Sequence, residues 1–369
     1  MQITNATDFL TGYTMGMKPD GRECIVVAIK ATFDLPESGP LCRLSAEQAP
    51  LVMADEFTGE PGYSSILYEV DFAPVKPRCD VLLNGSAYAP GGRPAEFVDV
   101  SLSVGNMKKG FRVVGDRTYG TGFVSFAPTD PEPFTSKPFS YDVAFGGCDT
   151  PADKPDQGKA FMKNPVGVGY YPISSGADLE GKPLPNTCES SDPIHSPTGK
   201  HRPMALGSLV RHAEERSQWA GTYDDHWQEN VFPFLPEDFD ERYYQSAPED
   251  QQIEYPEGGE TVELVNLTPE GRTSFELPAI DIPVEFTTRD FERIEKLPVL
   301  DTILIEPDLK RVVLVWRTSI PLKRDLFEIP SAVIGRMSRA WYRARETGKT
   351  FYPSLHAMAA SNRSEEEGE

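Results

Sequence analysis

The sequence predicts a mainly β protein, in which packed antiparallel sheets are built from hairpins and accompanied by a long irregular insertion and one C-terminal helix. Three observations predict this class. Turn signals recur between short apolar runs, one run alternates strictly between apolar and polar residues, and helical periodicity is strong in a single segment. With 369 residues, 39% of them hydrophobic, the chain is long enough to bury a sizeable core. We therefore expect a folded chain of one or two lobes.

The first strands are expected on either side of a tight turn. The tetrapeptide Lys18-Pro19-Asp20-Gly21 precedes a β-rich run over residues 24–33. Proline presets φ and glycine accepts a positive φ, so this tetrapeptide predicts a hairpin turn. The same device recurs at residues 36–39, 269–271 and 307–308, and we expect the chain to turn back on itself there as well.

Two further patterns place strands in the sheets. Apolar residues alternate strictly from 98 to 104, Gly105-Asn106 interrupts, and an apolar run resumes at 111–114, which predicts a hairpin with one buried face. Residues 312–316 are apolar on both faces, which is typical of a central strand. Residues 301–305 are its expected hairpin partner.

Residues 146–259 are different, because Pro, Gly, Asp and Ser are frequent and no period holds for long. We expect residues 1–330 to form one composite β domain, with sheets from 1–145 and 260–330 and this aromatic and acidic insertion between them. Long irregular segments in folded proteins are usually functional. The competing explanation is that single-sequence reasoning misses strands in this stretch.

The strong helix candidate covers residues 331–346, within a basic amphipathic segment at 331–358. Its apolar face comprises Val333, Met337, Ala340, Trp341 and Ala344, and its basic residues are Arg336, Arg339, Arg343 and Arg345. The helix either packs on the chain's own acidic surface or contacts a partner. Residues 359–369 are expected to form a disordered acidic tail.

Charge and cysteine content narrow the classes of function. A formal net charge of −21 argues against a nucleic-acid partner and favours a basic one. The five cysteines form no CxxC pair and are odd in number, which fits neither a disulfide framework nor a structural zinc site. No secretory signal pattern and no apolar run of about 18 residues is present, so we expect a cytoplasmic protein without membrane insertion.

The segment 219–252 concentrates aromatic residues and carboxylates, while its prolines prevent one continuous helix. Three interpretations of this segment are open: a docking surface, a catalytic cleft, or part of the core in which the aromatic residues are carried by irregular backbone. If a partner binds this chain, we expect it here, on eight residues: Trp219, Tyr223, Trp227, Phe232, Phe234, Phe239, Tyr243 and Tyr244.

No catalytic motif is recognised in the sequence, which contains no phosphate loop, dinucleotide fingerprint, GxSxG elbow or metal-binding histidine pattern. We therefore expect no enzyme activity, no cofactor and no metal site. His226 beside Asp224 is compatible with acid–base chemistry, but a solvated turn is the simpler interpretation. The enzymatic alternative is a carbohydrate-active enzyme with paired carboxylates, Asp224 with Asp238 or Asp240, beside aromatic rings.

The order of several landmarks resembles one bacterial family across roughly residues 5–320. The landmarks are Lys76-Pro77, Cys79-Asp80-Val81, residues 85–92, Val114-Gly115-Asp116-Arg117, residues 141–147, residues 164–169, Leu184-Pro185-Asn186, residues 220–224 with Trp227, Asp238-Phe239-Asp240, Ala247-Pro248 and Trp316-Arg317. The family was long catalogued as a domain of unknown function, and its genes often lie beside those for type VI secretion spike and PAAR-tip proteins.

This resemblance implies a non-enzymatic cytoplasmic chaperone or adaptor. Such a protein would bind a secreted effector, with the spike or PAAR-tip protein as a possible second partner, and would help to load the effector onto the spike. The resemblance supplies no catalytic residues that map onto this chain. A structural component of the spike is a further alternative.

Overall fold

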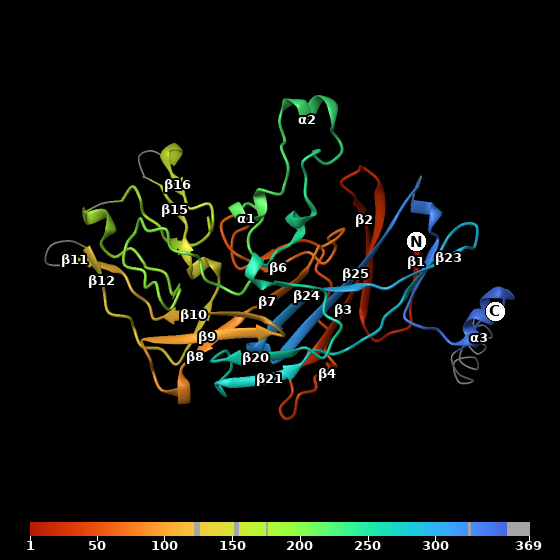
Figure 1. Ribbon diagram of the computed structural model, residues 1–369, viewed down its shortest axis with the longest axis horizontal. Coiled ribbons are helices and arrows are strands. Elements are labelled where there is room, and N and C mark those ends of the chain that lie inside the picture. Colours follow the sequence, from red (N-terminus) through yellow and green to blue (C-terminus); the bar gives the residue numbers. More distant parts are fainter. Residues whose placement is uncertain (122–125, 151–154, 175, 324–325, 353–369) are drawn as a thin grey trace, which may run out of the picture. The chain divides into compact units, whose positions relative to one another are not determined.

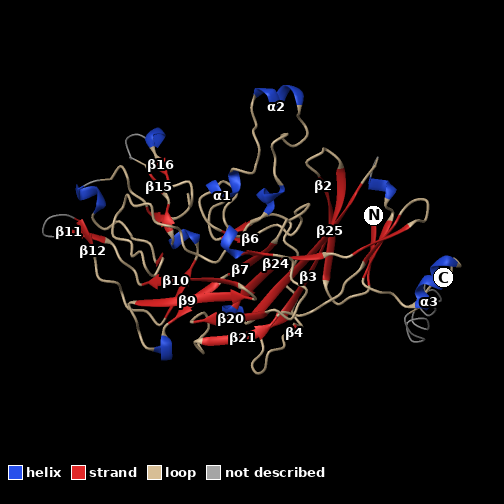
Figure 2. Ribbon diagram, in the orientation of Figure 1, coloured by secondary structure: helices blue, strands red, loops and turns tan. Residues whose placement is uncertain are grey.

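The computed structural model describes residues 1–121, 126–150, 155–174, 176–323 and 326–352 (Figure 1). The chain divides into two compact units. The first comprises Met1–Asp8, Asp281–Leu297 and Ile329–Glu369, and the second comprises Phe9–Ile280 and Pro298–Glu328. Strands dominate the secondary structure and helices are few and short (Figure 2), which confirms the mainly β class.

The second unit contains a seven-stranded sheet in the order β19-β7-β24-β25-β3-β2, with β4 also paired to β3. The strands are β2 (Leu10–Met17), β3 (Glu23–Asp34), β4 (Arg43–Leu44), β7 (Cys79–Leu83), β19 (Gln252–Ile253), β24 (Val299–Glu306) and β25 (Arg311–Pro321). The predicted turn at residues 18–21 connects β2 and β3, and Gly21 there has φ +78°. The turns at 36–39 and 307–308 are also confirmed, because β4 pairs with β3 and β24 with β25.

The two faces of this sheet differ in chemistry. On β3, every second residue from Ile25 to Phe33 is apolar, and all of them are buried. The opposite face carries Lys30, which is level with Val315 of β25, while Arg317 lies beside Ala28 on the same face. β25 lies between β24 and β3, so the prediction of a central strand at 312–316 is confirmed.

A five-stranded sheet of the same unit has the order β18-β10-β9-β20-β21. Its strands are β9 (Phe97–Val104), β10 (Met107–Val114), β18 (Thr187–Cys188), β20 (Thr261–Val265) and β21 (Arg272–Glu276). The predicted alternation in β9 is confirmed, because Val98, Val100, Leu102 and Val104 are buried. The turns at Gly105-Asn106 and 269–271 each close a hairpin, which confirms both predictions.

The remaining strands of this unit are short, and residues 146–259 contain no long regular element among those described. The short pairs are β5 (Glu56–Phe57) with β6 (Ile66–Tyr68), β8 (Gly85–Tyr88) with β13 (Ser136–Phe139), β11 (Tyr119–Thr121) with β12 (Phe126–Pro128), β14 (Phe145–Gly146) with β17 (Val168–Gly169), and β15 (Cys148–Asp149) with β16 (Lys159–Ala160). The helices here are α1 (Glu214–Ser217) and α2 (Asp225–Asn230). Irregular backbone therefore carries the aromatic segment, as expected.

The first unit contains a four-stranded sheet in the order β1-β26-β22-β23 and the helix α3 (Arg339–Glu346). The strands are β1 (Gln2–Asn5), β22 (Val284–Thr287), β23 (Arg293–Lys296) and β26 (Ser331–Ile334). None of the helices in the described part of the chain is long and apolar enough to cross a membrane.

The prediction of a helix over residues 331–346 is wrong for its first part. Residues 331–334 form β26, whose four side chains are buried while its backbone pairs with β1 and β22. Gly335, with φ +79°, ends that strand, and the helix begins only after Ser338, whose hydroxyl accepts a hydrogen bond from the Trp341 N–H. Strand pairing outweighed helical periodicity at Val333 and Ile334, which are β-branched. The predicted acidic tail at 359–369 lies outside the described residues.

Candidate functional site

Residues 220–238, here called the arm, project from the second unit with α2 at their far end (Figure 1). Two contacts close the base of the arm. The Asp238 carboxylate accepts hydrogen bonds from the Thr222 N–H (2.8 Å) and hydroxyl (2.7 Å), and the Asp240 N–H donates to the Trp219 carbonyl (3.1 Å). The arm is therefore a closed loop with a defined start and end.

Four of the predicted partner-binding residues lie on the arm: Tyr223, Trp227, Phe232 and Phe234, here called the tip cluster. Tyr223, Phe232 and Phe234 are 55%, 65% and 48% exposed. The Trp227 ring lies edge-on to Tyr223 (4.8 Å between centroids) and to Phe232 (5.6 Å), and its indole N–H donates to the Phe234 carbonyl. The rings of Tyr223, Trp227 and Phe232 pack on one another, and the exposed rings leave an apolar surface in contact with solvent.

The other four predicted residues, Trp219, Phe239, Tyr243 and Tyr244, form the base cluster where the arm leaves the unit. Phe239 is buried and contacts both tyrosine rings, at 5.9 and 5.5 Å between centroids. The Arg242 guanidinium lies 3.3 Å from the centre of the Trp219 ring. The structure thus separates the eight residues into a tip cluster with three exposed rings and a base cluster in which Phe239 is buried and the other three rings are half-buried.

The carboxylates of this segment have local structural contacts. Asp224 accepts the Trp227 N–H at the start of α2, and Asp240 binds Arg242. Hydrogen bonds from Thr222 hold the pKa of Asp238 below its usual range, and those from Arg242 do the same for the pKa of Asp240. A glycosidase acid needs a raised pKa, so neither residue suits that role. His226 lies beside Asn230 on the solvent side of α2.

Beneath the base cluster lies a set of eight buried ionic side chains that sequence reasoning did not identify, here called the charge network. Its members are Lys30, Glu69, Asp71, Lys76, Asp80, Arg216, Asp301 and Arg317, and no side chain among them is more than 8% exposed. Four cations and four carboxylates balance in charge. Such balance is required, because an unpaired charge is very costly to bury.

The charge network fixes the base cluster to the seven-stranded sheet. Arg216 of α1 binds Glu69 (2.6 Å) and also donates to the Tyr243 carbonyl (3.1 Å). Lys76 bridges Glu69 (3.1 Å) and Asp80 of β7 (2.7 Å). Asp80 in turn accepts the Ser246 N–H (2.8 Å) and the Gln245 side-chain amide, immediately after the base tyrosines. Charged side chains of the network therefore hold the backbone around Tyr243 in place beside the sheet.

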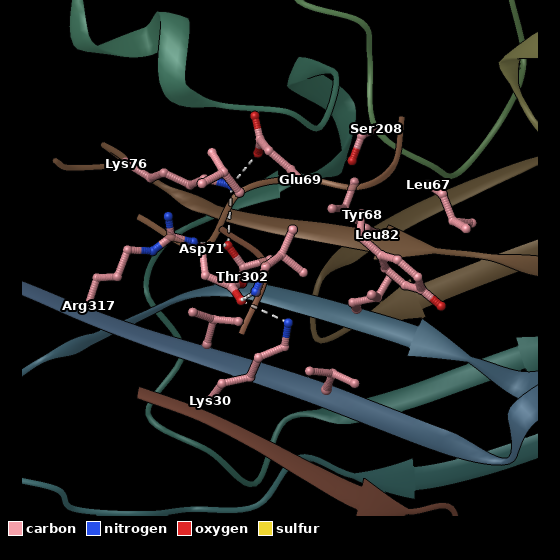
Figure 3. A pocket seen from close by; sticks show the side chains of 15 residues that line it. Lys30, Leu67, Tyr68, Glu69, Asp71, Lys76, Leu82, Ser208, Thr302 and Arg317 are labelled. Atoms are coloured by element: carbon pink, nitrogen blue, oxygen red, sulfur yellow. Dashed lines mark hydrogen bonds and ion pairs between the residues drawn. The ribbon is translucent and has the colours of Figure 1, made fainter. Parts of the chain in front are cut away.

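Lys30, Asp71 and Arg317 of the charge network line a small cavity (Figure 3). Lys30 binds Asp71 (2.9 Å), and Arg317 binds Asp301 (2.9 Å) and the Thr302 hydroxyl (2.9 Å). The cavity between Lys30, Asp71, Lys76 and Arg317 measures about 30 Å³. That is room for about two water molecules, so an organic substrate does not fit.

Burial and neighbouring charge act in opposite directions on these carboxyl groups. Burial alone would raise the pKa of Glu69, but Arg216, Lys76 and Arg211 outweigh it and hold that pKa well below its usual range. For Asp301 burial dominates and raises the pKa despite Arg317. Among the described residues, no three His, Cys, Asp or Glu side chains are grouped so as to hold a metal ion.

Comparison with known proteins adds one assignment. Neither the curated proteins nor the solved structures contain a match to this chain. One family model matches residues 20–317, which include the arm, the base cluster and the charge network. The chain therefore belongs to the family DUF2169, described as an uncharacterized protein conserved in bacteria.

Proposed function

We propose that this protein is a non-enzymatic adaptor that binds a client protein through the tip cluster of the arm. The observation that carries the proposal is the exposure of three aromatic rings on a loop that is closed by hydrogen bonds at its base. Aromatic rings at such positions are typical binding hot spots, because they bury a large area at a small cost in side-chain entropy.

The charge of the chain supports a protein client. A net charge of −21 attracts basic surfaces and repels polyanions, so a basic protein would be steered toward the arm. The local contacts of Asp224, Asp238 and Asp240 give no support to the carbohydrate-active alternative.

The proposal extends to the biological setting on the strength of the family resemblance. The client would be an effector of a type VI secretion system, and the adaptor would hold it in the cytoplasm and help to load it onto the spike or PAAR tip. The base cluster and charge network would provide the rigid support for the arm, since binding is tighter when less ordering is needed.

The test is co-purification with the effector encoded beside this gene, followed by titration of the purified pair. Replacing Phe232 and Phe234 together by Ala should weaken binding by about a hundredfold, because two exposed hot-spot rings are lost. Tyr63→Ala is the matched control, since Tyr63 is an exposed aromatic residue outside the arm. Equal binding by all three proteins would contradict the assignment of the arm.

A second measurement distinguishes the adaptor from the alternative, a structural component of the spike. An adaptor should be retained inside the cell, whereas a component of the spike should be recovered in secreted material in a fixed ratio to the other spike proteins. Normal stability and secretion of the effector after deletion of this gene would contradict the adaptor proposal.

A further inference from the structure

β2 is the outermost strand of the seven-stranded sheet and pairs with β3 alone. Its eight residues, LTGYTMGM, include no charged residue and no proline. Native edge strands are usually protected by charge, proline, a bulge or short length, because an open edge is a template for another strand. The opposite edge follows that rule, since β19 has only two residues. β2 has none of these protections.

The turn into β3 determines which backbone groups of β2 point away from the sheet. Lys18 N–H donates to the Arg22 carbonyl, and hydrogen-bonded pairs alternate along an antiparallel ladder. Leu10, Gly12, Thr14 and Gly16 therefore bond β3, and the residues between them direct their backbone groups outward. In the described part of the chain, the outward groups of Thr11, Met15 and Met17 have no hydrogen-bond partner.

The β2–β3 turn also lies against the arm. Gly21 in that turn has φ +78°, and a Cβ added there would lie 3.0 Å from the Phe234 ring. One ring of the tip cluster thus contacts the end of the hairpin that β2 begins. The strand that leads into this turn is eight residues long, about 27 Å at the rise of an extended strand. A client held by the tip cluster would have this edge within reach of a short extended segment.

We propose that β2 receives an extended segment of the client as an added strand, bonded through the outward backbone groups of Thr11, Met15 and Met17. The inference rests on the proposed function, because the client is the one bound by the arm. Strand addition fits this edge since main-chain bonds supply affinity without demanding a particular side-chain sequence. A second copy of this chain is the less suitable occupant, because each copy carries a net charge of −21.

The experiment is residue-resolved amide hydrogen exchange on the full chain, alone and with the purified effector. The amides of Thr11, Met15 and Met17 should exchange at least about tenfold more slowly in the complex, as expected for amides that gain a stable bond. Those of Gly12, Thr14 and Gly16 should be slow in both states. Outward amides that are already slow in the dilute free protein would overturn the proposal, because the edge would then be covered by the chain itself.

A pair of variants at one position supplies the matched control. Met15→Pro removes only an outward N–H and is compatible with an edge strand, whereas Met15→Ala keeps the N–H and removes the side chain. The proline variant should bind the effector about tenfold more weakly and the alanine variant within about twofold, with both melting near the wild type.

The outcomes separate this inference from the proposed function. If the wild type binds and Met15→Pro binds equally well, strand addition is wrong and the adaptor role stands. If the wild type does not bind the effector, both fail. If protection of the outward amides rises with protein concentration and light scattering shows a dimer, the occupant is a second copy and the inference is overturned.

Discussion

The tip and base clusters have nearly the same composition but lie in different environments. In the tip cluster, Trp227 packs against Tyr223 and Phe232, and the rings of both partners remain exposed. In the base cluster, Phe239 is buried, and the backbone of Tyr243 is bound by Arg216. Aromatic density alone therefore does not distinguish rings that stabilise a fold from rings available to a partner. The base cluster is bound to the buried ions of the charge network. Among the described contacts, the tip cluster has no such ions beside it.

The largest effect should come from the charge network. Glu69→Ala removes the carboxylate that pairs with Arg216 and leaves the charge network with one uncompensated buried positive charge, so the free energy of unfolding should fall by about 4 kcal/mol. Chemical denaturation would measure it. Glu263→Ala is the control, since Glu263 pairs with Arg272 at the surface, and it should cost less than about 1 kcal/mol. Similar losses in the two variants would mean that the buried pairs do not anchor the base.

Two phenylalanines compare the clusters directly. Phe239→Ala should lower the free energy of unfolding by about 3 kcal/mol, because it removes a buried ring and leaves a cavity beside Tyr243 and Tyr244. Phe232→Ala should change it by less than about 0.5 kcal/mol, since that ring is largely exposed. Thermal melts of both variants, with effector binding measured in parallel, check the difference. A larger loss of stability in Phe232→Ala than in Phe239→Ala would mean that the tip cluster belongs to the core.

Acid should destabilise the base through Glu69. Its pKa in the folded protein is lowered, so its contribution is present above the ordinary value of 4.5 and is lost as the pH falls below that value. The raised pKa of Asp301 acts in the opposite sense and offsets part of the loss. Melting temperatures from pH 7 to pH 3 should therefore fall less steeply in Glu69→Gln than in the wild type. Parallel curves would show that another group controls acid unfolding.

The smallest effect concerns the closure of the arm. Asp238→Ala removes the acceptor of both hydrogen bonds from Thr222. The Thr222 amide should then exchange about tenfold faster, while the melting temperature of the whole protein stays unchanged, because arm opening is local. Glu237→Ala is the neighbouring control, since it changes the adjacent carboxylate and leaves the Asp238 bonds in place. A large drop in melting temperature would mean that the arm folds together with the sheets.

The strands were predictable from sequence because alternation and turn residues are local signals. Residues 98–104 and the turn at Gly21 carried enough information to place two hairpins. The helix prediction failed at Val333 and Ile334 because pairing with two distant strands is not visible in a local period.

The charge network could not be predicted for the same reason. Arg216 and Glu69 are 147 positions apart, and nothing local to either residue specifies the other. The division between tip and base clusters also depends on this network. The family landmarks Lys76-Pro77, Cys79-Asp80-Val81 and Trp316-Arg317 include three of its members, Lys76, Asp80 and Arg317, and they were the nearest available signal.

The register shift between Leu300 and Thr302 in β24 has a consequence for chain length. Trp316 pairs with Leu300 and Val315 with Thr302, so Asp301 is one extra residue in an otherwise regular alternation. Deleting Asp301 would leave every other side chain of β24 on its present face and would remove only the carboxylate that binds Arg317. A one-residue deletion at this position thus acts as a point substitution, whereas the same deletion elsewhere in the strand would exchange its apolar and polar faces.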